Sequence, residues 1–149
     1  MDKKDLVKFL DEIFLPLDFK RKGNNWVSNG KIINKIVNLQ KSQYSNSYYI
    51  NYGYILNSLP LDNFTYHVDN RLASKDKSEQ ELITDLLNLE NDIDSEKRLV
   101  LLRNIIDSKI VEEIKFISKE EDILRILKAR AHLYTIPPFV LKYFDLRIE

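Results

Sequence analysis

Apolar positions recur at helical spacing in the first fifteen residues and alternate with polar positions over the next fifty. The five apolar residues that define the first pattern are Leu6, Phe9, Leu10, Ile13 and Phe14, and Pro16 follows where a helix should stop. Apolar residues at intervals of three and four are typical of an amphipathic helix, and proline cannot continue one. The sequence therefore predicts an N-terminal helix over residues 3–15.

The next region predicts an antiparallel sheet. Asn29-Gly30 is a strong hairpin signal, because both residue types tolerate positive φ angles. Successive short segments follow one another with turns and no helix between them, which favours a meander. We predict four to five strands over about residues 19–72, at 19–22, 26–28, 31–42, 48–56 and 64–72.

The second half predicts helices. Ser78 with Glu81, and Ser118 with Glu121, have the spacing of capping boxes at helix starts. Residues 109–117 fit either a helix or a late strand, and Pro137-Pro138 precedes a short terminal helix. We expect a single α+β domain over residues 1–149 without a linker, in which the C-terminal helices pack on one face of the sheet.

Alternation along the predicted strands separates two sheet faces. Tyr48, Tyr52 and Tyr66 fall on a face that we expect the helices to cover, which leaves the other face polar. That polar face is our candidate binding site, with Asn38, Gln40, Ser42, Asn51, His67, Asp69 and Arg71. An antiparallel sheet with one hydrated side gives the same pattern without any function, so both interpretations stay open.

Composition is that of an ordinary globular protein. The chain has 149 residues, a formal net charge of zero and no cysteine. These features argue against disulfides, thiolate metal sites and a global field for nucleic acid. The N-terminus lacks the uninterrupted apolar run of a signal peptide, and no stretch could span a membrane. We expect a soluble, cytoplasmic protein with no membrane association.

Charge is distributed unevenly along the chain. Residues 1–75 carry eleven Lys/Arg against seven Asp/Glu, whereas residues 76–149 carry twelve against sixteen. Acidic residues are densest between Asp76 and Glu96, where Lys77 is the one basic residue. This stretch is a candidate surface for a basic partner, and its residues of interest are Asp85, Glu90, Asp92, Asp94 and Glu96.

Catalytic and cofactor signatures are weak. The two histidines, His67 and His132, do not form a metal-binding pair, and the three glycines are too scattered for a phosphate loop. Glu113-Ile114-Lys115 has the acid-x-lysine spacing of some nucleases, but a solvated, charged helix face explains it better. We predict no metal, no cofactor and no catalytic residue.

Several segments together resemble a bacterial family known as domain of unknown function 4304. The segments are residues 19–23 shortly before Trp26, residues 37–42, residues 48–53, and His67 followed by Arg71-Leu72. The resemblance is best over residues 1–75 and looser beyond. It implies an α+β domain built on an antiparallel sheet and a bacterial cytoplasmic origin. It implies no established activity.

We expect a non-enzymatic, protein-binding module with an unidentified protein partner, and one specific form would be an immunity protein that neutralises a toxin. A different hypothesis is a small-molecule or nucleotide binder or hydrolase, with His67 as general base, Asp69 orienting it and Arg71 holding an anion. A third is a single-strand nucleic-acid binder, against which the neutral net charge argues. Its stacking residues would be Tyr44, Tyr48, Tyr49, Tyr52 and Tyr54, close to Lys20, Arg21, Lys22 and Lys41.

Overall fold

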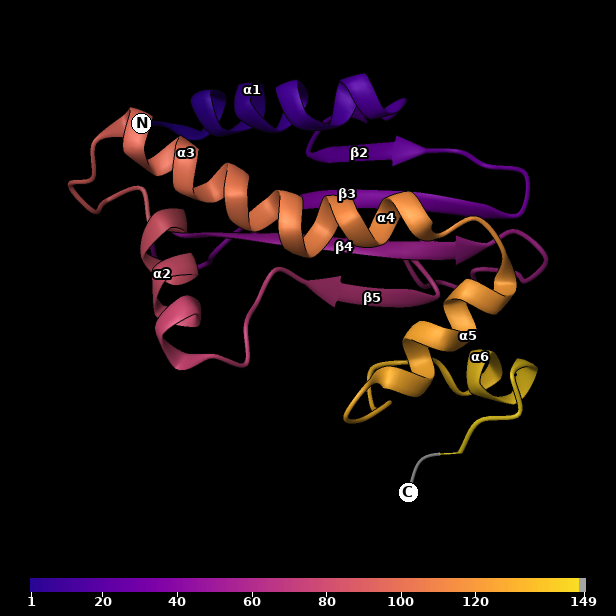
Figure 1. Ribbon diagram of the computed structural model, residues 1–149. Helices are drawn as coiled ribbons and strands as arrows, with labels where there is room; N and C mark the ends of the chain where they lie inside the picture. Colours follow the sequence, from indigo (N-terminus) through magenta and orange to yellow (C-terminus); the bar gives the residue numbers. More distant parts are fainter. Residues whose placement is uncertain (148–149) are drawn as a thin grey trace.

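The computed structural model describes residues 1–147 and has the predicted α+β architecture, in which an N-terminal helix precedes a five-stranded antiparallel sheet and helices follow it (Figure 1). The strands lie in the order of the sequence, as a meander. They are β1 (Lys20–Lys22), β2 (Asn25–Ser28), β3 (Ile33–Lys41), β4 (Tyr48–Leu56) and β5 (Val68–Arg71).

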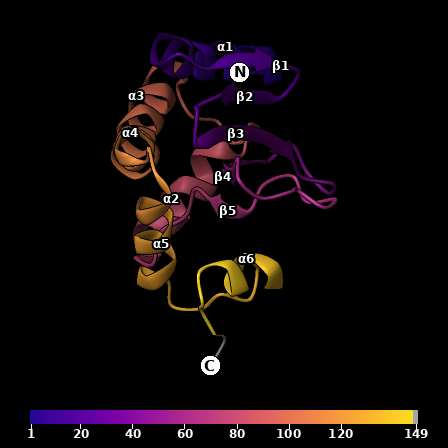
Figure 2. The ribbon, with the colours of Figure 1, turned by 90° about the vertical axis from the view of Figure 1, so that its right-hand side faces the viewer.

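Helix α1 (Lys3–Phe14) lies beside β2 at one end of the sheet (Figures 1 and 2). Asp2 caps it by accepting from the amide of Asp5 at 3.0 Å. A 3₁₀ turn, η1 (Leu15–Leu17), follows the helix. All five apolar residues that predicted this helix are buried against the sheet. On the polar side, the Asp11 carboxylate accepts from the indole of Trp26 at 2.8 Å and from Arg21 at 3.0 Å, which fixes the helix to the first two strands.

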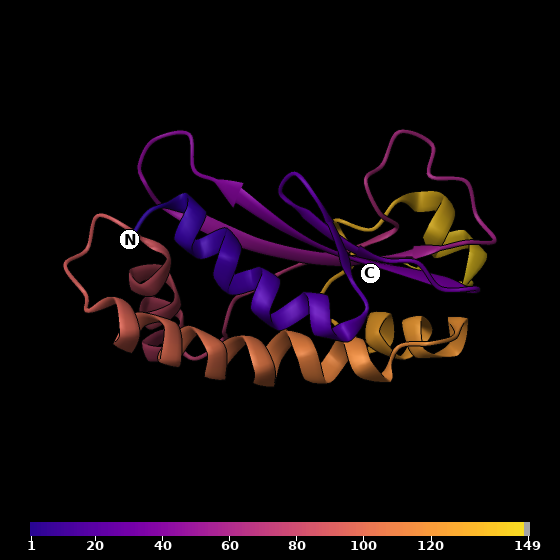
Figure 3. The ribbon, with the colours of Figure 1, turned by 90° about the horizontal axis from the view of Figure 1, so that it is seen from above.

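The longest helical element crosses one face of the sheet (Figures 1 and 3). Helix α3 (Ser95–Ile106) continues through a π-helical turn, η2 (Asp107–Val111), into α4 (Glu112–Phe116). Its four most deeply buried residues are spaced four apart: Leu102, Ile106, Ile110 and Ile114. An α-helix has 3.6 residues per turn, so a strict spacing of four would drift off the sheet, and the wider π turn corrects the drift. Residues 109–117 are therefore helical rather than a strand.

Helix α2 (Lys77–Leu87) packs at the end of the sheet near the start of α3, and α5 (Glu120–Ala129) follows α4 on the same side. Helix α6 (Pro138–Tyr143) begins at the double proline, as predicted. It lies on the other side of the sheet from α5 (Figures 2 and 3). The C-terminal helices thus cover one face, except for α6.

Three local expectations were wrong. Only Val68–Arg71 of the predicted strand 64–72 is extended, because Asp62 and Asn63 adopt positive φ angles and start an irregular loop instead. Helix α2 is capped by Asp76 and not by Ser78. At the start of α5, Asp122 accepts from the amides of Ser118 and Lys119, at 2.9 and 3.1 Å, in place of Glu121.

Candidate functional site

A row of polar side chains crosses the open face of the sheet. Asn25, Asn38, Asn51 and Arg71 are cross-strand neighbours on β2, β3, β4 and β5. Arg71 Nε donates to Asn51 at 2.9 Å, Asn51 donates to Asn38 at 3.1 Å, and Asn38 donates to Asn25 at 2.8 Å. We call these four residues the polar row. Directly opposed side chains on adjacent strands lie close enough to bond, so the sheet register itself builds the row.

Two further residues hold Arg71 in one orientation. Gln40 Oε1 accepts from Arg71 Nη2 at 3.0 Å and from Asn51 at 2.9 Å. The guanidinium carbon of Arg71 lies 4.1 Å from the centre of the Tyr49 ring, a cation–π distance. Arg71 is exposed, and no carboxylate of residues 1–147 pairs with it. The open face therefore presents a fixed positive charge.

His67 does not belong to this exposed face. Its side chain is fully buried, with Nδ1 accepting from the Leu56 amide at 2.9 Å and Nε2 lying 2.8 Å from the Pro60 carbonyl. The ring of Phe139, from α6, meets its ring edge-on at 5.8 Å. Both ring nitrogens are occupied, so His67 has no free nitrogen for the general-base role in the hydrolase hypothesis.

Asp69 and Ser42 are also separate from the polar row. Asp69 accepts from the Thr135 hydroxyl at 2.9 Å and pairs with Arg130, which also donates to the Asp69 carbonyl. It thereby attaches the α5–α6 connection to β5 and does not orient His67. Ser42 lies in the turn after β3, where its hydroxyl accepts from the Tyr44 amide at 3.2 Å. Of the seven predicted residues, the structure brings together Asn38, Gln40, Asn51 and Arg71.

The helix-covered face contains a polar pair that the sequence analysis missed. Glu113 of α4 accepts a 2.5 Å hydrogen bond from the Tyr54 hydroxyl of β4. Burial raises the pKa of Glu113, while the Tyr54 bond and the charge of Arg130 oppose the shift. Burial also raises the pKa of Tyr54, and Glu113 adds to that effect. Glu113 is therefore a half-buried, specifically bonded acid and not part of a solvated charged face.

A lysine of the same face is also partly buried. Lys35 of β3 donates to the Ile114 carbonyl of α4. Burial lowers the pKa of Lys35, and the charge of Asp122 opposes the shift. This contact joins α4 to the centre of the sheet.

The acidic stretch forms an exposed surface. Asp85, Glu90, Asp92, Asp94 and Glu96 are all exposed, on the end of α2, the start of α3 and the connection between them. We call this set the acidic segment. None of its five carboxylates forms an ion pair with a cation in the part of the chain that the structure describes. Asp94 also caps α3, accepting from the Lys97 amide at 3.0 Å.

A buried arginine supports the acidic segment from below. Arg98 is 2% exposed, and it donates to the backbone carbonyls of Leu86 at 2.5 Å, Asn91 at 2.8 Å and Asn88 at 3.2 Å, with a longer contact to Asp85. Burial lowers the pKa of Arg98. Its donors are directed to carbonyls rather than carboxylates, so the segment keeps a fixed shape and its full negative charge.

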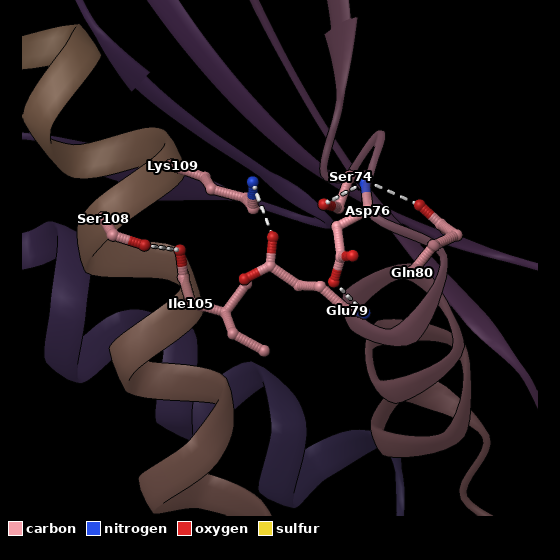
Figure 4. A network of polar contacts seen from close by, with 7 residues as sticks. All are labelled: Ser74, Asp76, Glu79, Gln80, Ile105, Ser108 and Lys109. Atoms are coloured by element: carbon pink, nitrogen blue, oxygen red, sulfur yellow. Dashed lines mark hydrogen bonds and ion pairs between the residues drawn. The ribbon is translucent and has the colours of Figure 1, made fainter.

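A second contact anchors the other end of α2 (Figure 4). Lys109, in the π-helical turn, pairs with Glu79 at 2.9 Å, and the Gln80 side chain accepts from the Ser74 amide at 2.8 Å. The hydrogen bond from Lys109 lowers the pKa of Glu79, and a bond from Ser74 adds to this. Helix α2 is thus held at both ends.

The tyrosines are divided between the faces. Tyr48, Tyr52 and Tyr54 are buried under the helices, and Tyr49 lies against Arg71. Tyr44, in a turn, is 93% exposed. The sheet therefore does not present the base-stacking platform that a single-strand nucleic-acid binder needs.

Comparison with known proteins identifies the family. The model of the family described as Domain of unknown function (DUF4304) matches residues 10–115, more than half of the chain. The chain belongs to the DUF4304 family. The match extends past residue 75, where the resemblance had looked loose, to the last turn of α4. No curated protein and no solved structure matches the DUF4304 chain significantly.

Most of the polar features fall within the matched part of this DUF4304 domain. The polar row, the acidic segment, Arg98 and Glu113 all lie between residues 10 and 115, whereas α5 and α6 lie outside. Across residues 1–147, none of the helices is both long and apolar enough to cross a membrane.

Proposed function

We propose that this DUF4304 domain is a non-enzymatic protein-binding module that contacts a basic partner through the acidic segment. One observation carries the proposal: five exposed carboxylates without a paired cation lie on a segment whose backbone is fixed from below by Arg98. Charge complementarity steers association and selects partners, and a preordered surface loses less entropy on binding.

The narrower form of the proposal is an immunity protein that neutralises a toxin. Its support is chemical: a toxin that acts on nucleic acid carries a basic surface, which an acidic segment complements in charge and can cover. The inhibitor in such a pair needs no catalytic group of its own.

Co-purification with three forms of the tagged protein tests the proposal. The first bait is the wild type, and the second carries amide replacements at the acidic segment: Asp85→Asn, Glu90→Gln, Asp92→Asn, Asp94→Asn and Glu96→Gln. Asn keeps the cap of α3 at position 94. The third is a matched control with five exposed acids replaced elsewhere: Glu12→Gln, Asp18→Asn, Asp62→Asn, Glu112→Gln and Glu121→Gln.

We expect the wild type and the control to retain the same basic protein from the source organism, and the acidic-segment variant to lose it. A product of a neighbouring gene that is toxic alone and harmless with this domain would support the immunity form. Identical sets of retained proteins for all three baits would contradict the whole proposal, since the acidic segment would then contribute nothing.

A further inference from the structure

A groove of about 970 Å³ runs round the β5 edge of the sheet. It is walled by β5, by α5 and by the connection that follows α5, and it reaches the open face at Asn51 and Gln40. Its size suits a ligand of nucleotide dimensions. It lies at the α5 end of the long α3–α4 helix, whereas the acidic segment lies at the α2 end (Figure 1).

Positive side chains dominate the charged lining of this groove. Four arginines and lysines line it, against two acids, in a chain whose net charge is zero. The cations are Arg71, Lys75, Arg125 and Arg130, and the acids are Asp69 and Glu113. The arginine that follows α5 neutralises Asp69 directly, so the remaining charge of the lining favours an anion.

Arg71 has the features of an anion anchor. Its guanidinium is held by Asn51, Gln40 and the ring of Tyr49, and it has no carboxylate partner among the described residues. Only Nε and Nη2 are engaged, which leaves further N–H groups for a phosphate oxygen. A guanidinium that is already oriented loses little entropy when it binds a phosphate.

Tyr66 supplies an aromatic surface beside Arg71. A side chain at Gly53 would come within 2.8 Å of the Tyr66 ring, so the ring lies directly against the β4 backbone. Burial raises the pKa of Tyr66, and the charge of Asp69 adds to the shift. A half-buried ring beside a fixed guanidinium offers stacking for a planar base and charge for its phosphate.

We propose that the groove binds a nucleoside phosphate, with Arg71 holding the phosphate, Lys75 and Arg125 adding charge, and Tyr66 contacting the base. This site is independent of the protein-binding proposal, because the acidic segment shares no residue with the groove. Either one can fail without the other.

Calorimetric titration of the full chain tests the ligand class. The probes are the 5′-mono- and diphosphates of adenosine, guanosine, cytidine and uridine, with each free nucleoside and inorganic phosphate as comparisons. At least one nucleoside phosphate should bind with a dissociation constant below about 1 mM, and its nucleoside should bind at least about tenfold more weakly. Added salt should weaken the binding, because the contacts are partly exposed.

Matched substitutions locate the site. Arg71→Gln should weaken binding by about tenfold or more, the cost of losing a hydrogen bond to a charged group. Lys75→Gln and Arg125→Gln, both at exposed positions, should each weaken it by about threefold. The controls Lys77→Gln and Lys128→Gln replace exposed lysines nearby that do not line the groove, and they should stay within about twofold. If Arg71→Gln fails to fold, the Lys75→Gln and Arg125→Gln double variant supplies the test.

Three outcomes would overturn the proposal. The first is that no nucleoside phosphate binds more tightly than about 1 mM. The second is equal affinity for inorganic phosphate and for every nucleotide, which would mean an adventitious ion only. The third is that the lining and control variants weaken binding equally, which would place the ligand elsewhere.

Discussion

The acidic segment and the β5-edge groove carry opposite charges, and an arginine determines the character of each. Arg98 is buried and donates to carbonyls, so its charge supports the backbone and leaves the carboxylates above it unpaired. Arg71 is exposed and is held by neutral groups, so its charge remains available to a ligand. The difference shows that burial and bonding partners decide whether an arginine serves the fold or a ligand.

The largest expected effect of a single substitution is at Arg98. Arg98→Met leaves several carbonyls of the α2–α3 connection without a donor and should lower the free energy of unfolding by about 3 kcal/mol. Urea denaturation measures it. Arg103→Met is the control, since Arg103 makes only an exposed ion pair with Asp107 and should cost less than about 1 kcal/mol. Equal losses for the two variants would remove the contrast between a structural and a surface arginine.

The polar row should respond next. Asn51 is 8% exposed and bonds to Arg71, Asn38 and Gln40, so Asn51→Ala should cost about 2 kcal/mol. Asn104→Ala, at an exposed position of α3, should change stability by less than about 0.5 kcal/mol. The same Asn51 variant should weaken nucleotide binding, because Arg71 loses one of its supports. Unchanged stability and unchanged binding would show that the row does not position Arg71.

Alternation in the sequence predicted the polar row but not its limits. Asn38, Gln40, Asn51 and Arg71 were correctly placed on one face, because a strand has a fixed period of two. His67 was misplaced, since the strand pattern was extended into a loop whose left-handed residues break the alternation. No property of the sequence alone indicated that Phe139, more than sixty positions away, would cover His67.

Two buried charged residues left a signal that the helix analysis did not use. Glu113 stands at helical spacing from Ile110 and Ile117, on the apolar stripe itself. Arg98 likewise stands four positions before Leu102 on the stripe of α3. A charged residue on an apolar stripe faces the core and must find a partner there, so its position was predictable although its partner was not.

The third prediction concerns pH and the wall of the groove. Folding raises the pKa of Glu113 above its ordinary value of 4.5, so the folded chain favours the protonated carboxyl. Its contribution to stability is complete below pH 4.5 and is lost as the pH rises through the raised pKa. Glu113→Gln removes this titration. The unfolding free energy of the variant should therefore improve relative to the wild type between pH 4 and pH 8, which urea denaturation at each pH measures.

A constant difference between the two proteins over that range would contradict a raised pKa for Glu113. Glu112→Gln is the control, because Glu112 is exposed and adjacent in sequence. Its difference from the wild type should stay flat.

The smallest expected effect is at the ion pair below α2. Lys109→Gln removes the 2.9 Å contact with Glu79 and should cost about 0.5 kcal/mol, decreasing with added salt. Lys115→Gln, at an exposed position with no ion pair in the described chain, should cost less. A loss as large as that of Arg98→Met would mean that this end of α2, and not Arg98, holds the acidic segment.

The affinity of the co-purified basic protein for the domain, measured over a series of salt concentrations, tests the central claim most directly. The account predicts that replacing the five carboxylates of the acidic segment weakens binding by about a hundredfold at low salt and removes most of the salt dependence, while the matched control changes neither. Affinities within about twofold of the wild type at every salt concentration would contradict it.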